Sequence, residues 1–203
     1  MLDSRTQVIY RSEWTYRFVD ILVAIPLAIL FTPIILVLCI PTALAIDSKV
    51  FFTQKRVGQF GREMLFTKIR SIKVFSTIDL IAEHDHIYYQ NMYEMIPRWG
   101  EFMRRFSLDE LPQIFLVVMG RMSLVGPRPI LENEVAHYGE AFATVFSIKP
   151  GLTGYWQISG RKNLSWEDRV NLDLVYLENR SLMENLKICL RTIPAVLVGR
   201  GAY

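Results

Sequence analysis

The chain has 203 residues, enough for one or two small hydrophobic cores, and 51% of them are hydrophobic, which exceeds ordinary soluble usage. Its two cysteines support neither a disulfide framework nor a cysteine metal site, and they fit a reducing, cytoplasm-facing compartment. The net charge is +3 and no recognised nucleic-acid motif accompanies it, so we expect no nucleic-acid partner.

Residues 21–46 form an uncharged run of 26 residues, which is long enough to cross a bilayer. Pro26, Pro33 and Pro41 interrupt this run and favour a bent helix. Basic residues flank both ends, and the positive-inside tendency keeps both flanks in the cytoplasm. We therefore predict a re-entrant membrane helix that bends near Thr32 and Pro33 and leaves on the face it entered. A straight span and a cleaved signal peptide are the alternatives.

A β-hairpin is predicted next, because residues 50–54 and 64–68 resemble strands and flank a turn region that contains Gly58 and Gly61. This region is also basic. Residues 49–73 contain seven Lys or Arg and one acid, so anionic partners should gather here.

The rest of the chain is predicted to be mainly helical, with a polar loop and short helix over residues 76–92. Residues 96–106 mix aromatic and basic side chains, which suits a helix in the headgroup layer or one packed on the core. Ser165 and Ser181 each begin a cap signature, and the last helix covers residues 182–198. The fold class is therefore α+β, mainly helical, with a re-entrant membrane helix, a small β-hairpin and amphipathic interfacial helices.

Two adjacent carboxylates, Asp109 and Glu110, follow Ser107, and Ser107 with Glu110 has the spacing of a capping box. We expect both acids in the first turn of an amphipathic helix that ends before Gly120. The helix dipole favours the ionised form of Asp109 there, which suits a carboxylate that attacks an electrophile. The alternative is that these residues only cap the helix and complement its dipole.

Two later stretches can hold phosphate. Arg128 stands between two prolines, which restrict the backbone and place the guanidinium group firmly. The stretch from Lys149 to Arg161 has a basic residue at each end, three glycines that permit close backbone approach, and aromatic rings that can stack on a base or sugar. Each stretch alone is also typical of a turn.

Taken together, three motifs behind a proline-bent apolar segment resemble the bacterial monotopic phosphoglycosyl transferases. They are Ser-Leu-Asp-Glu-Leu-Pro-Gln at 107–113, Met-Ser-Leu-Val-Gly-Pro-Arg-Pro at 122–129 and Lys-Pro-Gly-Leu-Thr-Gly through Gly-Arg at 149–161. The likeness covers about residues 14–203 and is greatest to exopolysaccharide-initiating members. It implies transfer of a hexose phosphate from a UDP-sugar to polyprenyl (undecaprenyl) phosphate, with release of UMP and with Mg²⁺, as the first membrane step of glycan assembly.

By this resemblance, Asp109 is the nucleophile that carries the phosphosugar. Glu110 would either help to hold Mg²⁺ or assist proton movement, and both acids are the metal ligands that the resemblance implies. The resemblance implies Arg104 and Arg128 as substrate-binding positions and Arg161 and Lys68 as weaker candidates. Lys149 is a further candidate, as the basic residue at the start of its stretch. Arg121 stands where the family commonly has an acid, so a metal-ligand role for that acid is not carried over.

The resemblance also implies an organisation and a location. Residues 1–47 would hold the re-entrant helix, and residues 48–203 a catalytic domain lying on the cytoplasmic face of the bacterial inner membrane, with a homo-oligomer as one option. Two rival functions remain open: a non-catalytic membrane anchor or assembly factor for glycan export, and a UDP-sugar diphosphate hydrolase.

Overall fold

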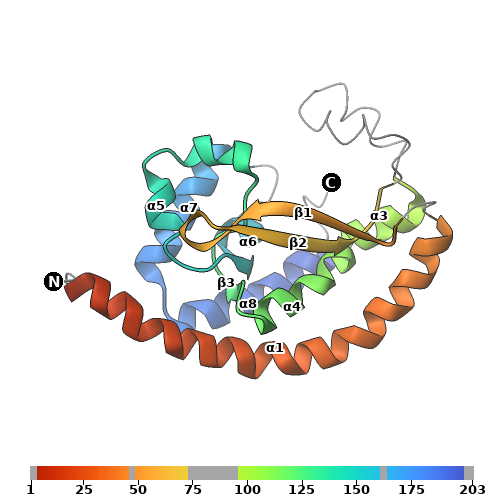
Figure 1. The fold of residues 1–203 in the computed structure, drawn as a ribbon, viewed down its shortest axis with the longest axis horizontal. Coiled ribbons are helices and arrows are strands. Elements are labelled where there is room, and N and C mark those ends of the chain that lie inside the picture. Colours follow the sequence, from red (N-terminus) through yellow and green to blue (C-terminus); the bar gives the residue numbers. More distant parts are fainter. Residues whose placement is uncertain (1–3, 46–48, 73–95, 161–163, 199–203) are drawn as a thin grey trace.

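The computed structural model describes residues 4–45, 49–72, 96–160 and 164–198 (Figure 1). The predictions for residues 76–92 and for Arg161 therefore lie outside the described residues. Its elements are the helices α1 (Ser4–Ala45), α3 (Arg98–Arg105), α4 (Ile114–Val118), α5 (Ala141–Val145), α6 (Tyr155–Ser159), α7 (Trp166–Asn179) and α8 (Leu182–Val198), the 3-10 helices η1 (Gln59–Gly61), η3 (Leu108–Gln113) and η4 (Glu132–Tyr138), and the strands β1 (Phe51–Val57), β2 (Glu63–Ile69), β3 (Ser123–Val125) and β4 (Gly151–Thr153). The mainly helical α+β class is confirmed.

Helix α1 is continuous and curves along one side of the molecule, with the other elements on its concave side (Figure 1). Its buried residues recur at intervals of three, four or seven, which gives one helix face; they are Tyr16, Asp20, Ala24, Ala28, Ile35, Leu38 and Thr42. Pro26 and Pro33 are exposed on the other side. A proline ring pushes away the carbonyl one turn earlier, so prolines on the outer face bend the helix around the core. The Thr32 hydroxyl donates to the Ala28 carbonyl at 2.7 Å.

Two polar side chains of α1 fix the segment that follows η3. Arg17 donates to the carbonyls of Val117 and Val118, at 2.5 and 2.7 Å, and so satisfies the C-terminal end of α4. Asp20 is buried and accepts hydrogen bonds from the Ser123 hydroxyl and the Leu124 amide, at 3.1 and 2.9 Å. Helix α1 is therefore tied directly to α4 and β3.

The predicted hairpin is confirmed, because β1 and β2 pair antiparallel with Phe52 opposite Lys68. A second pair was not predicted: β3 and β4 lie parallel, with Ser123 opposite Gly151 and Val125 opposite Thr153. Each strand has only three residues, and the pairing joins the two stretches that the sequence suggested as phosphate-binding turns.

The helix predicted over residues 96–106 is present as α3, and its sides are mixed. Met103 is fully buried against the C-terminal part of α1, and the Trp99 indole donates to the Thr42 hydroxyl at 2.9 Å. Phe102 is exposed and stacks on Trp99. The helix packs on the core, as one of the two predicted arrangements has it, and the placement in the headgroup layer stays a prediction.

Both C-terminal cap signatures are confirmed. The Ser165 hydroxyl accepts from the Asp168 amide at 3.1 Å, and the Asp168 carboxylate reaches back to the Ser165 amide at 3.3 Å. The Ser181 hydroxyl accepts from the Glu184 amide at 3.1 Å, at the start of α8. Several large apolar side chains of α8 are exposed, namely Leu182, Met183, Leu186, Leu190, Ile193, Leu197 and Val198.

Candidate active site

The segment that carries the two acids differs from the predicted capped α-helix. Ser107 has a left-handed backbone with φ of 53° and makes no capping hydrogen bond, and residues Leu108–Gln113 form a 3-10 helix before α4 begins. Pro112 accounts for part of this, since it lacks an amide hydrogen and disfavours α geometry in Leu111 before it. The predicted capping box is wrong, and the acids are held by tertiary packing of η3 on β2.

Asp109 is buried, with 5% of its surface exposed. Burial raises the pKa of its carboxyl group to about 6, and the charge of Glu110 acts in the same direction, while Lys68 and Arg104 lower the pKa. The expectation that a helix dipole would stabilise the ionised form is therefore wrong in sign. Above pH 6 the group is still mainly ionised, and it is more basic than an ordinary aspartate.

The two cations next to Asp109 come from different elements. Lys68 lies on β2, partly buried, with its ammonium group 5.5 Å from the Phe52 ring centroid. Burial lowers the pKa of Lys68, and the charges of Asp109 and Glu110 oppose this effect. Arg104, on α3, has a buried Nε with no hydrogen-bond partner among the described residues. A buried donor without a partner is costly, so this group suits an anionic ligand.

Arg128 reaches the same site from the loop after β3. Its guanidinium group lies 3.7 Å from a carboxylate oxygen of Glu110. Arg56 on β1 anchors this loop by donating a hydrogen bond to the Pro129 carbonyl at 3.3 Å. Rigid placement of Arg128 between two prolines agrees with the sequence expectation.

The glycines in the two motifs serve backbone packing. The amide of Gly126 donates to Thr153 at 2.9 Å, and that of Gly151 donates to Pro127 at 2.8 Å. A Cβ on Gly151 would lie 2.0 Å from the Gly126 nitrogen, and one on Gly154 would lie 2.4 Å from the Gly126 oxygen. The motifs need glycine here because their backbones touch each other, whereas the sequence suggested approach to a phosphate.

Other predicted residues lie elsewhere or have different surroundings. The charged groups that act on Lys149 are Arg17, Glu13 and Asp20 of α1, so it is not grouped with Asp109. Trp156 is buried, with 8% of its surface exposed, and lies beside Arg128, its ring centroid 5.6 Å from the guanidinium carbon.

One residue of this region was missed. Arg169 on α7 lies 5.2 Å from the Trp156 ring centroid and 4.7 Å from that of Trp166. The signal was present in the sequence, because positions three apart on a helix share a face and Arg169 follows Trp166 by three. Sequence reasoning used that stretch only for its cap.

The donor set fits a hard divalent cation that is completed by substrate. Asp109 and Glu110 supply two carboxylates, and no group of three His, Cys, Asp or Glu side chains able to hold a metal occurs in the part of the chain that the structure describes. Mg²⁺ commonly binds through one or two carboxylates and the phosphates of a substrate, so two acids are sufficient.

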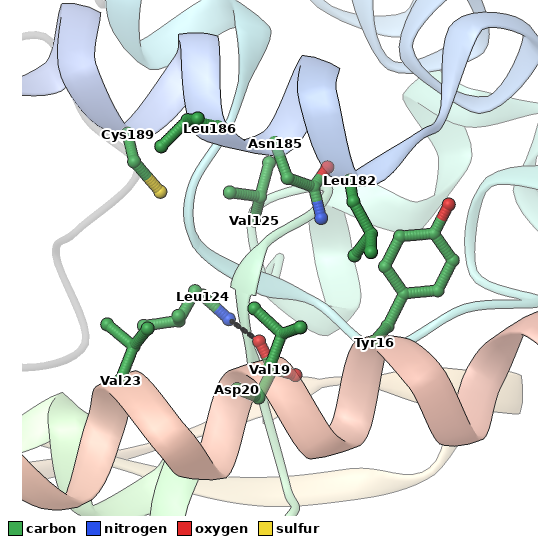
Figure 2. Close-up of a pocket in the computed structure, with 10 residues that line it drawn as sticks. All are labelled: Tyr16, Val19, Asp20, Val23, Leu124, Val125, Leu182, Asn185, Leu186 and Cys189. Atoms are coloured by element: carbon green, nitrogen blue, oxygen red, sulfur yellow. Dashed lines mark hydrogen bonds between the residues drawn. The ribbon is translucent and has the colours of Figure 1, made fainter.

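A separate cavity of about 160 Å³ lies between α1, β3 and α8 (Figure 2). Its wall is mostly apolar, from residues such as Val19, Val23 and Leu186, and the Asp20 carboxylate is turned toward Leu124 within it. None of the predicted site residues lines this cavity, so it is distinct from the Asp109 cluster.

Comparison with known proteins gives this arrangement a family. The family described as bacterial sugar transferase matches residues 11–199. The chain belongs to the bacterial sugar transferase family. The resemblance drawn from the three motifs is confirmed, and the enzyme class predicted from it agrees with the names of the relatives.

Three relatives indicate the range of the family. The chain is 35% identical to the exopolysaccharide production protein ExoY of Rhizobium meliloti, over 92% of this chain and 87% of that protein. It is 37% identical to a UDP-galactose-lipid carrier transferase of Erwinia amylovora, over 96% of this chain and 43% of that protein. It is 35% identical to a UDP-glucose:undecaprenyl-phosphate glucose-1-phosphate transferase of Xanthomonas campestris, over 84% of this chain and 36% of that protein. The chain thus spans less than half the length of the last two.

Proposed function

We propose that this protein transfers a hexose-1-phosphate from a UDP-sugar to undecaprenyl phosphate, through a phosphosugar bound to Asp109, and so initiates exopolysaccharide or related glycan assembly. The observation that carries the proposal is the burial of Asp109 beside Lys68 and Arg104, with Glu110 and Arg128 adjoining. The names of relatives, which include a galactose and a glucose phosphotransferase acting on undecaprenyl phosphate, support the substrate class.

In the first step, a carboxylate oxygen of Asp109 forms a bond to the β-phosphorus of the donor. The bond from that phosphorus to the oxygen bridging to the α-phosphate breaks, and the electron pair leaves with UMP. Lys68 and Arg104 offset the negative charge that accumulates around the phosphorus. The raised pKa of Asp109 keeps the carboxylate basic, which favours attack, and it is still ionised at neutral pH.

In the second step, an oxygen of undecaprenyl phosphate attacks the same phosphorus. The bond from phosphorus to the Asp109 oxygen breaks and the carboxylate returns to its starting state. Burial of Asp109 excludes bulk water, which favours transfer to the lipid over hydrolysis.

We further propose that Asp109 and Glu110 hold Mg²⁺ when substrate is bound. The ion would neutralise negative charge on the diphosphate. Arg128 lies 3.7 Å from Glu110 and would orient that carboxylate.

Helix α1 would lie in one leaflet as a re-entrant element, with the catalytic domain on the cytoplasmic face. Among the described residues, α1 is the one helix long and apolar enough to cross a membrane, over Glu13–Ala45, and 22% of its apolar 18-residue window is buried. Its contacts with the rest of the chain run from Tyr16 to Thr42, near both ends. A helix that touches one globular body along its whole buried face, Ala24 and Ala28 included, supports a bent course over a straight crossing.

The nucleophile is tested with Asp109→Asn, assayed for UMP release from a panel of UDP-sugars with undecaprenyl phosphate in lipid nanodiscs. We expect loss of UMP release, because an amide does not form the acyl phosphate. Glu63→Gln is the matched control, since Glu63 is an exposed acid on the hairpin. Full UMP release by the Asn variant would reject the nucleophile. Undiminished UMP formation without lipid acceptor would indicate a hydrolase, and wild-type protein without any turnover would indicate an anchor or assembly factor.

The topology is tested by labelling single cysteines placed at Arg11 and Lys55, in a background without Cys39 and Cys189, in intact cells. We expect both sites to resist a membrane-impermeant reagent and to react after permeabilisation. Reaction of one of the two from outside would reject the re-entrant course.

A further inference from the structure

A row of alternating cations and rings leads away from the two acids. Arg128, which pairs with Glu110, also lies 5.6 Å from the Trp156 ring centroid. Arg169 lies 5.2 Å from the same ring. Two guanidinium groups therefore lie near one indole ring, and one of them also pairs with Glu110.

The row continues outward along α7. The Arg169 guanidinium carbon also lies 4.7 Å from the Trp166 ring centroid. His137 stacks on Trp166, with ring centroids 4.4 Å apart and an interplanar angle of 6°. His137 is exposed, so the row runs from the interior of the site to the surface.

Helix α7 has other contacts besides this row that hold it in place. Helix α7 is already fixed by the Ser165 cap and by the Tyr138 hydroxyl, which donates to buried Asp173 at 3.0 Å. Two guanidinium groups near one ring concentrate positive charge near the two acids, which favours an anionic ligand. The buried Trp156 Nε1 has no hydrogen-bond partner among the described residues.

The donor in the proposed reaction has two phosphates, and they need cations at two places. Lys68 and Arg104 are adjacent to Asp109, where the β-phosphorus must lie. The α-phosphate leaves with the nucleoside and must sit one step further from Asp109. Arg169 is the next cation in the row after Arg128, because both lie near the Trp156 ring.

Resting on the proposed function, we propose that Arg169 binds the α-phosphate of the nucleotide donor, and that the nucleoside extends toward Trp166 and His137. The same contact would hold the departing UMP. Arg169 is thus a substrate-binding residue supplied by α7, the helix that follows the three motifs.

The experiment compares binding of UMP and of uridine, by calorimetry, to full-length wild-type protein, Arg169→Gln and Arg169→Lys in nanodiscs. Uridine lacks the phosphate, so a true phosphate contact affects UMP alone. We expect Arg169→Gln to weaken UMP binding roughly tenfold and to leave uridine unchanged, because a charge-assisted hydrogen bond contributes about that much. Arg169→Lys keeps the positive charge, so its UMP affinity should lie between those of wild type and Arg169→Gln.

Arg62→Gln is the matched control, because Arg62 is an exposed arginine on the hairpin and should bind both ligands like wild type. UMP affinity in Arg169→Gln within twofold of wild type, or equal weakening of UMP and uridine, overturns the inference. Either result leaves the proposed function intact as long as wild-type protein releases UMP from a UDP-sugar. Failure of the wild-type protein to do so removes the proposed function and this inference together.

Discussion

Two buried aspartates lie in different regions of this molecule, and the charges around their carboxyl groups differ. Asp173 on α7 is 1% exposed, and burial raises its pKa to about 7, with only the Tyr138 hydroxyl donor acting against this. Asp109 is 5% exposed and has a like charge beside it, yet its pKa is about 6. Lys68 and Arg104 make the difference.

The comparison teaches that burial supplies basicity and that nearby cations decide whether a buried acid is ionised at working pH. Asp173 is half protonated near neutrality and belongs to the packing of η4 against α7. Asp109 is kept charged beside groups that can also receive a phosphate. Four changes break or sharpen this contrast, and they follow in order of expected effect.

The largest effect is expected from Asp109→Asn, which removes the nucleophile. UMP release should fall by at least about a thousandfold, as expected for loss of a covalent catalytic group. Asp173→Asn should retain most activity in the same assay. Equal losses in the two variants would contradict the assignment of Asp109 as the nucleophile.

Glu110→Gln should lower UMP release by roughly ten- to hundredfold, since it removes a general acid–base and metal-binding group. The charge of Glu110 raises the pKa of Asp109, so the residual activity should persist to lower pH than in wild type. A pH–rate profile measures this shift of the acid limb. A shift of the acid limb to higher pH would contradict the assigned effect of Glu110 on the pKa of Asp109.

Lys68→Gln should have the opposite effect on the profile. Removing this cation raises the pKa of Asp109 further, so activity should fall about tenfold at pH 7 and recover at higher pH. Lys55→Gln is the control, because Lys55 is exposed on the same hairpin. Equal pH–rate profiles for Lys68→Gln and the control would show that Lys68 does not act on the pKa of Asp109.

The smallest effect concerns stability and Asp173. Its folded pKa, about 7, lies above the ordinary value of 3.8, so the contribution to stability is full below pH 4 and is lost as pH rises through 7. Asp173→Asn removes this dependence. Relative to wild type, its unfolding temperature should therefore rise between pH 5 and pH 8. A constant difference across that range would contradict the raised pKa.

Local patterns predicted most of the fold. The hairpin and the caps at Ser165 and Ser181 depend on neighbours within a few residues, so sequence spacing was sufficient for them. The parallel pair of β3 with β4 was missed because each strand has three residues and its partner is distant in sequence. The glycines that allow this pairing were interpreted as ligand contacts for the same reason.

The residues of the candidate site were predictable from the sequence, whereas the pKa shift of its central acid was not. Asp109, Glu110, Arg104, Arg128 and Lys68 were named from motifs, and the fold brings them together. The sign of the Asp109 pKa shift was wrong because a helix dipole is a local effect, whereas burial by β2 and α3 is a tertiary one. Arg169 was missed because its link to Arg128 passes through Trp156 on another element.

The most direct test of the central claim is to trap the covalent intermediate. The protein is mixed with UDP-sugar without lipid acceptor and reduced with borohydride, which converts an aspartyl phosphate to homoserine. Peptide mass spectrometry then locates the change. We predict homoserine at position 109 in wild-type protein, dependent on UDP-sugar. Modification of another residue during productive UMP release, or none at all, would contradict the account.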